Sequence, residues 1–295
     1  MTQYAITDIG SNTMVLIFYE IHDGVPIQMY HESTPAHLID YVDADRIMSK
    51  EGIAEAARVL ALYDQKCDTA GIEYRFADIT EPCRIGNQQE LVDALAKTKF
   101  EIHPLTGYQE AAYDYIGTRF SYPDVRDGIA FDVGGGSTEL ISFRDSKPVD
   151  AVSFHLGCVR LSHLPLDTQE CAKELQKIRK EYPSLNTASK DLIGIGGTMR
   201  YAGLVCNDLY HTDHMLPVVR LREMYQRLLD HEAEAEEAVM REVRVSRQPL
   251  LLPGIHMILE ICNAYEAETI LISDTGIRDG FLLECLHLTN GQENA

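Results

Sequence analysis

Basic residues are scarce in this sequence, and their scarcity limits what the protein can bind. The chain of 295 residues has 26 Lys and Arg against 46 Asp and Glu, a formal net charge of −20. Non-specific binding of DNA or RNA needs a basic footprint, and contact with anionic lipids needs a polybasic segment. We therefore expect no nucleic-acid partner and no membrane partner. An anionic small molecule stays compatible with this charge, because backbone amides and a bound metal ion act locally.

Long apolar runs and paired cysteines are also missing. No uncharged stretch approaches the roughly 20 residues needed to span a bilayer, and the N-terminal segment reaches Asp8 too early for a secretory signal. The seven cysteines are scattered, with no Cys-x-x-Cys pair. Scattered thiols in a chain of this size are typical of reduced, buried residues. We expect a cytoplasmic protein.

The sequence does contain alternating strand-like and helix-like segments, and 45% of its residues are apolar, enough for substantial cores. A prior of roughly 150 residues per domain suggests two domains. Apolar β-forming runs predict strands at 4–9, 14–19, 27–31, 74–79, 101–104, 128–133, 139–143, 149–155, 192–195 and 269–273. Helical spacing predicts helices at 49–70 (capped by Ser49 and Gly71), 88–97, 109–120, 169–182, 199–204, 221–239, 255–264 and 277–288. A hairpin turn is expected at Asp23-Gly24 and a polar tail from Gly291. The fold class is α/β.

Two turns in the chain have the same plan. Thr7–Thr13 and Phe131–Thr138 each run from an apolar strand through Asp, an apolar residue, Gly and small polar residues into a β-rich segment. Asp132 follows Asp8 by 124 residues, about one domain, which indicates two related lobes. We place the first lobe at 1–122 and the second at 123–280, with a C-terminal helix at 281–295 that could join the first lobe.

These turns have the composition of phosphate-binding loops. Glycine allows positive φ and close approach of the backbone to a ligand, and successive amides form an anion-binding nest. Ser11, Thr13, Ser137 and Thr138 add hydroxyl donors. One such turn alone would be an ordinary hairpin; two with the same plan favour phosphate. Neither fits the P-loop or the dinucleotide motif, and a strand–turn–strand phosphate loop points to an actin-like architecture with two lobes facing across a cleft.

Carboxylates stand at the strand ends beside the turns, namely Asp8, Asp132 and Glu139. Mg²⁺ prefers one or two carboxylates together with waters and substrate phosphates. Asp132 and Glu139 are seven residues apart, and a tight hairpin between them can bring both carboxylates to the same end of the two strands. The alternatives are a turn-capping role for Asp132 and a solvent-facing strand position for Glu139.

Seven segments, in order along nearly the whole chain, resemble the exopolyphosphatase / guanosine pentaphosphate phosphohydrolase (Ppx/GppA) family of the actin-like ATPase superfamily. The segments are Asp8–Thr13, Thr80–Asn87, Thr106–Ala111, Asp132–Leu140, Leu156–Leu161, Gly194–Thr198 and Ser273–Gly280. The resemblance implies two actin-like (ribonuclease H-like) lobes with a cleft between them, and a homodimer. The departures from the family pattern are Thr106, Gln109, Pro249 and Asp279.

The resemblance also implies roles for individual residues. Glu110 matches the catalytic base that activates a water molecule, and Asp132 and Glu139 match the Mg²⁺ ligands. The residues implied to bind phosphate are Asp8, Gly10, Ser11, Asn12, Thr13, Arg84, Gly134, Gly135, Gly136, Ser137, Thr138, Gly196, Gly197 and Thr198. The implied reaction is attack of water on the end of a phosphoanhydride chain, with release of orthophosphate.

The substrate stays open at this point. Inorganic polyphosphate is our first expectation and guanosine pentaphosphate the alternative; no residue decides between them. The chain resembles the short form of the family, which favours short or medium polyphosphate chains. Two hypotheses come from other functional classes. One is a catalytically silent phosphate or nucleotide sensor, motivated by Gln109 and Pro249. The other is an ATP-dependent phosphotransferase of the sugar-kinase type.

Overall fold

The computed structural model describes residues 2–22, 25–166 and 168–293. The predicted hairpin turn at Asp23-Gly24 and the last two residues of the predicted tail lie outside the described residues. The chain divides into two compact units, one made of Met1–Glu110 and Phe281–Ala295 and the other of Ala111–Gly280. Both divisions fall inside helices, namely α3 (Gly107–Thr118) and α10 (Ile277–Glu293). Each unit carries one β-sheet and its own buried core.

The first unit is built on a five-stranded sheet in the order β3-β2-β1-β4-β5. Its strands are β1 (Gln3–Ile9), β2 (Thr13–His22), β3 (Val25–Pro35), β4 (Tyr74–Ile79) and β5 (Glu101–Pro104). The first three form an antiparallel meander, β4 is parallel to β1, and β5 is parallel to β4. Helices α1 (Lys50–Ala70) and α2 (Gln88–Leu95) contact each other and share the buried core of this sheet. Short 3₁₀ turns η1 (Leu38–Tyr41) and η2 (Glu81–Cys83) follow β3 and β4.

The second unit repeats this plan with a six-stranded sheet in the order β10-β11-β9-β6-β7-β8. Its strands are β6 (Gly128–Val133), β7 (Thr138–Arg144), β8 (Lys147–Phe154), β9 (Asp191–Ile195), β10 (Met215–Pro217) and β11 (Thr269–Ile272). Read from β8, its first five strands follow the order and directions of the other sheet, with β6–β7–β8 as the meander and β9 and β11 parallel to β6. The topology therefore confirms the internal repeat predicted from the two similar turns.

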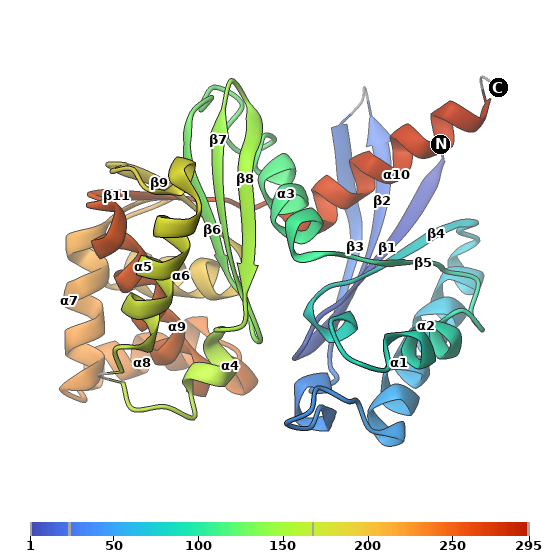
Figure 1. Ribbon diagram of the computed structural model, residues 1–295, viewed down its shortest axis with the longest axis horizontal. Helices are drawn as coiled ribbons and strands as arrows, with labels where there is room; N and C mark the ends of the chain where they lie inside the picture. The colour runs from blue at the N-terminus through green and yellow to red at the C-terminus, as the bar shows by residue number, and fades with distance from the viewer. Residues whose placement is uncertain (1, 23–24, 167, 294–295) are drawn as a thin grey trace. The chain divides into compact units, whose positions relative to one another are not determined.

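Six helices belong wholly to the second unit: α4 (Cys158–Leu161), α5 (Glu170–Glu181), α6 (Gly196–Tyr210), α7 (Val218–Leu229), α8 (Ala233–Glu242) and α9 (Gln248–Tyr265). Figure 1 shows them grouped beside the sheet. α6 and α9 contact β6, and their apolar residues join the strands in one large buried core. This packing fixes the carboxyl ends of β6 and β9, where the second glycine-rich turn and Gly196 lie.

All ten predicted strands are present, but several helix predictions were wrong in extent. The predicted helix at 221–239 is two helices, because His231 adopts a left-handed φ of 54° between α7 and α8. α9 begins at Gln248, seven residues earlier than predicted, because Pro249 lies in the first turn, where its missing amide costs nothing. α10 continues to Glu293, so the predicted tail is helical at 291–293. The short elements β10 and α4 were not predicted.

The structure also bears on the expectations drawn from composition. No helix within the described residues has the length and apolarity needed to cross a bilayer. All seven cysteines are free and buried, as predicted. Burial raises the pKa of the Cys67 and Cys171 thiols to about 12. These thiols therefore act as small core side chains and not as nucleophiles.

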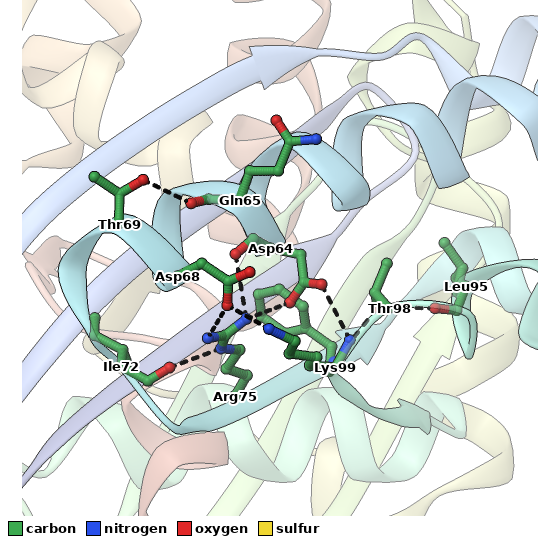
Figure 2. Close-up of polar contacts among 10 residues, drawn as sticks. Asp64, Gln65, Asp68, Thr69, Ile72, Arg75, Leu95, Thr98 and Lys99 are labelled. Atoms are coloured by element: carbon green, nitrogen blue, oxygen red, sulfur yellow. Dashed lines mark hydrogen bonds and ion pairs between the residues drawn. The ribbon is translucent and has the colours of Figure 1, made fainter.

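A buried arginine ties α1 to the start of β4. Figure 2 shows Arg75 surrounded by acceptors from the C-terminal half of α1 and the following turn. Its guanidinium is 2.6 Å from Asp64 and 2.7 Å from Asp68, and its Nε donates to the carbonyl of Ile72. The Arg75 side chain is only 6% exposed, so these partners, and not water, stabilise its positive charge. β4 is held at this end, and its other end carries the segment Thr80–Asn87.

Arg75→Gln is expected to destabilise the protein by about 2 kcal/mol, because it leaves Asp64 and Asp68 without their shared cation. Hydrogen bonds from Lys99 and then Arg75 lower the pKa of Asp68. A lowered pKa contributes stability above the unfolded value of about 3.9 and loses it as the pH falls. The difference between variant and wild type should therefore shrink below about pH 4. Urea unfolding checks both points. Arg58→Gln, which removes the exposed ion pair with Glu55, is the control and should unfold at the same urea concentration as the wild type.

Candidate active site

The second glycine-rich turn joins β6 to β7 and is held from behind by α4. The amide of Gly134 donates to the carbonyl of Ser137 at 3.0 Å and closes the turn. The amides of Cys158 and Val159 donate to the carbonyls of Gly134 and Gly135, each at 2.9 Å. Arg160 Nε donates to the carbonyl of Gly136 at 3.0 Å. Three consecutive carbonyls of the turn therefore point toward α4.

The direction of these carbonyls fixes the direction of the amides. In a planar trans peptide, the N–H of each residue points opposite to the carbonyl of the residue before it. The amides of Gly135, Gly136 and Ser137 therefore point away from α4. Successive amides that point the same way form an anion-binding nest. The turn has the geometry to receive a phosphate group on that side.

The first turn, between β1 and β2, is built in the same way. The Gly10 amide donates to the carbonyl of Thr13 at 3.2 Å. The amide of Ile39 donates to the carbonyl of Ser11 at 2.9 Å, and Ala36 and His37 donate to that of Asn12 at 3.0 Å. The amides of Asn12 and Thr13 therefore point away from η1. Each unit thus carries one such turn, in the same position relative to its meander.

The glycines in and behind the turns are needed mainly because other atoms lie too close to them for a Cβ to fit. A Cβ at Gly157 would lie 2.4 Å from the carbonyl oxygen of Gly135. Because that atom belongs to the backbone, the turn itself would have to move to make room. Gly10 and Gly134 do not use the positive φ that glycine allows, because φ at both positions lies outside that range. Positive φ occurs instead at Gly196 (φ 81°), where a Cβ would also overlap the carboxylate of Asp132 at 2.1 Å. Gly196 has to be glycine for both reasons.

The two predicted metal-binding carboxylates are cross-strand neighbours. Asp132 on β6 pairs with Glu139 on β7, and Glu139 pairs with Ser153 on β8. Ser153 donates its hydroxyl to Glu139 Oε1 at 2.6 Å. Asp132 lies against Gly196 at the N-terminus of α6, which favours a negative charge. Like charges opposite each other on neighbouring strands repel, and a cation beside them removes the repulsion.

This donor set fits Mg²⁺ better than a metal that needs a complete protein cage. Within the described residues, no group of three or more His, Cys, Asp or Glu side chains is placed to hold a metal ion. Mg²⁺ takes one or two carboxylates and fills its remaining positions with waters and substrate phosphates. Asp132 and Glu139 supply two carboxylates, which fits this preference.

Several hydroxyls that the sequence suggested as phosphate donors point to protein acceptors. Ser11 donates to Glu81 at 2.8 Å, Thr138 to the carbonyl of Leu156 at 2.7 Å, and Thr198 to the carbonyl of Val133 at 2.6 Å. A hydroxyl has one proton to donate. Backbone amides, and not these three side chains, therefore hold the capacity to bind an anion.

In the first unit, the structure brings Arg84 and Glu110 together. Glu110 lies in the first turn of α3 and is 7% exposed. Arg84 follows η2, and its Nη1 donates to Glu110 Oε2 at 2.6 Å. The Arg84 segment also reaches the first turn, since Thr80 donates its amide and its hydroxyl to the carbonyl of Ile9. A buried carboxylate paired with an arginine, whose own segment is bonded to a turn with the geometry of an anion nest, is an arrangement suited to positioning and activating water.

The residues that depart from the family pattern have visible structural roles. Thr106 and Gln109 form a reciprocal cap at the start of α3: the Gln109 amide donates to Thr106 Oγ1 at 3.2 Å, and the Thr106 amide donates to Gln109 Oε1 at 3.0 Å. This cap fixes the turn that carries Glu110. Asp279 likewise accepts the amide of Gly276 at the start of α10, at 2.9 Å.

Sequence reasoning missed four residues that shape these turns. Gly157 and Arg160 hold the second turn, and the only signal was their place in the family-like segment Leu156–Leu161. Glu81 accepts the Ser11 hydroxyl although it is itself 5% exposed. Arg46 binds Glu81 and the carbonyl of Arg84. Nothing in the sequence around Arg46 marks it.

Comparison with known proteins agrees with this architecture. A model of the Ppx/GppA phosphatase family matches residues 17–289, and the chain belongs to this family. A crystal structure of the family member from Aquifex aeolicus superposes with a TM-score of 0.79 at 23% identity, covering 98% of this chain and 99% of that one. An exopolyphosphatase from Cytophaga hutchinsonii superposes with a TM-score of 0.81 at 18% identity, covering 97% and 98%. These likenesses establish the actin-like fold predicted from the sequence.

Two sequence relatives carry names of activities. A putative exopolyphosphatase of Haemophilus influenzae is 22% identical over 294 residues, 95% of this chain and 90% of that protein. A guanosine-5'-triphosphate,3'-diphosphate pyrophosphatase of Pseudoalteromonas atlantica is 22% identical over 158 residues, 53% of this chain and 31% of that protein. Membership of the family implies a hydrolase that acts on phosphoanhydride bonds.

Gly157→Ala is expected to weaken binding of tripolyphosphate roughly tenfold or more. The added Cβ displaces the second turn, and hydrogen bonds to a charged group contribute roughly 1.5–3 kcal/mol each. Isothermal titration calorimetry measures this directly. Gly203→Ala adds the same methyl in the same unit against only the Ile272 side chain and serves as the control. Equal affinity in the two variants would contradict a phosphate-binding role for this turn.

Proposed function

We propose that this protein is an exopolyphosphatase that uses Mg²⁺ to hydrolyse the terminal phosphoanhydride bond of inorganic polyphosphate. The observation that carries the proposal is the buried Glu110 carboxylate, fixed by a helix cap and paired with Arg84 next to a phosphate-binding turn. The similarity of nearly the whole chain to a putative exopolyphosphatase supports the choice of polyphosphate.

Each group in the proposal has a defined task. Glu110 takes a proton from the attacking water, which bonds to the terminal phosphorus while the bridging P–O bond breaks. Arg84 and the outward amides of the two turns neutralise phosphate charge, since positioning and electrostatics dominate phosphoryl transfer. Asp132 and Glu139 would hold the Mg²⁺, which when bound supplies positive charge to the phosphate oxygens.

Glu110→Gln is expected to lower kcat on polyphosphate by about 10²–10⁴-fold, the usual contribution of a general base. Phosphate release from polyphosphate and from guanosine pentaphosphate is measured for wild type and variant at saturating Mg²⁺. Glu90→Gln, an exposed glutamate on α2 of the same unit, is the control and should match the wild type. Equal rates in wild type and Glu110→Gln would remove Glu110 as the base.

The same assay separates the alternative functions. Phosphate release only from guanosine pentaphosphate would make the protein a guanosine pentaphosphate phosphohydrolase. The partial similarity to the Pseudoalteromonas atlantica protein supports this alternative. Binding of polyphosphate without release from either substrate would favour a sensor. Gln109 and Pro249, the two departures that motivate the sensor hypothesis, have structural roles, as a helix cap and in the first turn of α9. ATP-dependent transfer to an acceptor would identify a phosphotransferase.

Asp132→Asn and Glu139→Gln are each expected to raise the Mg²⁺ concentration for half-maximal activity roughly tenfold or more, since each removes one of two carboxylates. A magnesium titration of phosphate release tests this. Asp124→Asn, exposed in a turn of the same unit, controls for the loss of one charge. An unchanged midpoint in both variants would place the metal elsewhere.

A further inference from the structure

Arg46 belongs to a turn that is bound to the Arg84 segment along its length. The carbonyl of Arg46 accepts the amide of Gly86 at 2.8 Å. Asn87 bonds both backbone groups of Met48, accepting from its amide at 3.0 Å and donating to its carbonyl at 2.9 Å. The Arg46 side chain completes the contact, with Nε donating to the carbonyl of Arg84 at 2.9 Å and Nη2 donating to the same atom. These bonds join residues 46–48 to residues 84–87.

The same guanidinium also reaches the first phosphate turn. Arg46 Nη2 lies 3.6 Å from Glu81 Oε1, and Glu81 Oε2 accepts the Ser11 hydroxyl at 2.8 Å. Arg84, whose carbonyl Arg46 binds, pairs with Glu110 at 2.6 Å. Ser11, Glu81, Arg46, Arg84 and Glu110 thus form a continuous series of polar contacts within one unit, which we call the Arg46 network.

The chemistry of this network requires an arginine. Glu81 is 5% exposed, and a buried carboxylate needs partners. A planar guanidinium donates from several nitrogens in a fixed geometry and can bind a carbonyl and a carboxylate together, which an ammonium does less well. Arg46 also holds a left-handed φ of 60°, a conformation that persists only where the surroundings fix it.

We propose that Arg46 is a positioning residue for the hydrolytic reaction: it holds Arg84, and through it Glu110, in register with the phosphate turn at Gly10–Thr13. The proposal rests on the proposed function, because it assigns Arg46 to the same base and turn. The Arg46 side chain contacts Glu81 and the carbonyl of Arg84, so it acts on Glu110 through Arg84. Its removal should therefore slow the chemical step more than it weakens binding, since loss of orientation lowers kcat.

The experiment compares Arg46→Gln, Arg46→Lys and the exposed control Arg58→Gln in phosphate release from polyphosphate. We expect kcat to fall roughly tenfold or more in Arg46→Gln, with partial recovery in Arg46→Lys, while KM changes by less than about threefold. In the Glu110→Gln background, Arg46→Gln should have little further effect, because both act through one group. A rise in KM at unchanged kcat would overturn the proposal and make Arg46 a direct phosphate contact.

A second measurement does not depend on activity. Cys83 lies in the segment that Arg46 holds, and its buried sulfur is 3.2 Å from the carbonyl oxygen of Ile79 and 3.4 Å from that of Leu105. Release of this segment in Arg46→Gln should speed alkylation of Cys83, followed by peptide mass spectrometry, at least several-fold over Arg58→Gln. Equal alkylation rates in the two variants would overturn the proposal. An inactive wild type would instead refute the proposed function, and an active wild type indifferent to Arg46 would refute this inference alone.

Discussion

A planar peptide cannot point its carbonyl and the next amide in the same direction, and the two turns that we propose to bind phosphate depend on that constraint. In each turn, consecutive carbonyls are bound from behind, by α4 and Arg160 in one unit and by the residues around η1 in the other. The amides then point outward together without any unusual backbone angle at Gly10 or Gly134. The anion-binding capacity of the turns therefore comes from the segments behind them.

This arrangement also reconciles a strongly acidic chain with an anionic substrate. Net charge acts over distances that salt screens, whereas the amides, Arg84 and the Mg²⁺ that we propose Asp132 and Glu139 hold would act at close range. Buried acids near the turns are matched to specific partners: Glu81 to Ser11 and Arg46, and Glu110 to Arg84. The −20 charge is a sum over the whole chain, so it does not give the local charge beside the turns.

The sequence predicted the features that short-range rules control. A four-residue turn fixes the register of its hairpin, so the pairing of Asp132 with Glu139 followed from their spacing. The repeated turns predicted two related sheets, and cap residues placed α1 correctly. Contacts between segments that are distant in the sequence could not be predicted. Arg84 contacts Glu110 across 26 residues, and Arg46 contacts Arg84 across 38. The need for glycine at Gly196 could not be predicted either, because the close approach of Asp132 is a tertiary contact.

Amide chemical shifts test most directly whether the amides of the two turns bind phosphate, as we propose. Deuterated, ¹⁵N-labelled protein is titrated with pyrophosphate and observed by NMR. The largest shifts are expected at Asn12, Thr13, Gly135, Gly136 and Ser137, because these amides point away from the segments that bind the carbonyls. Saturable binding that leaves these five amides unshifted while others move would contradict the proposal.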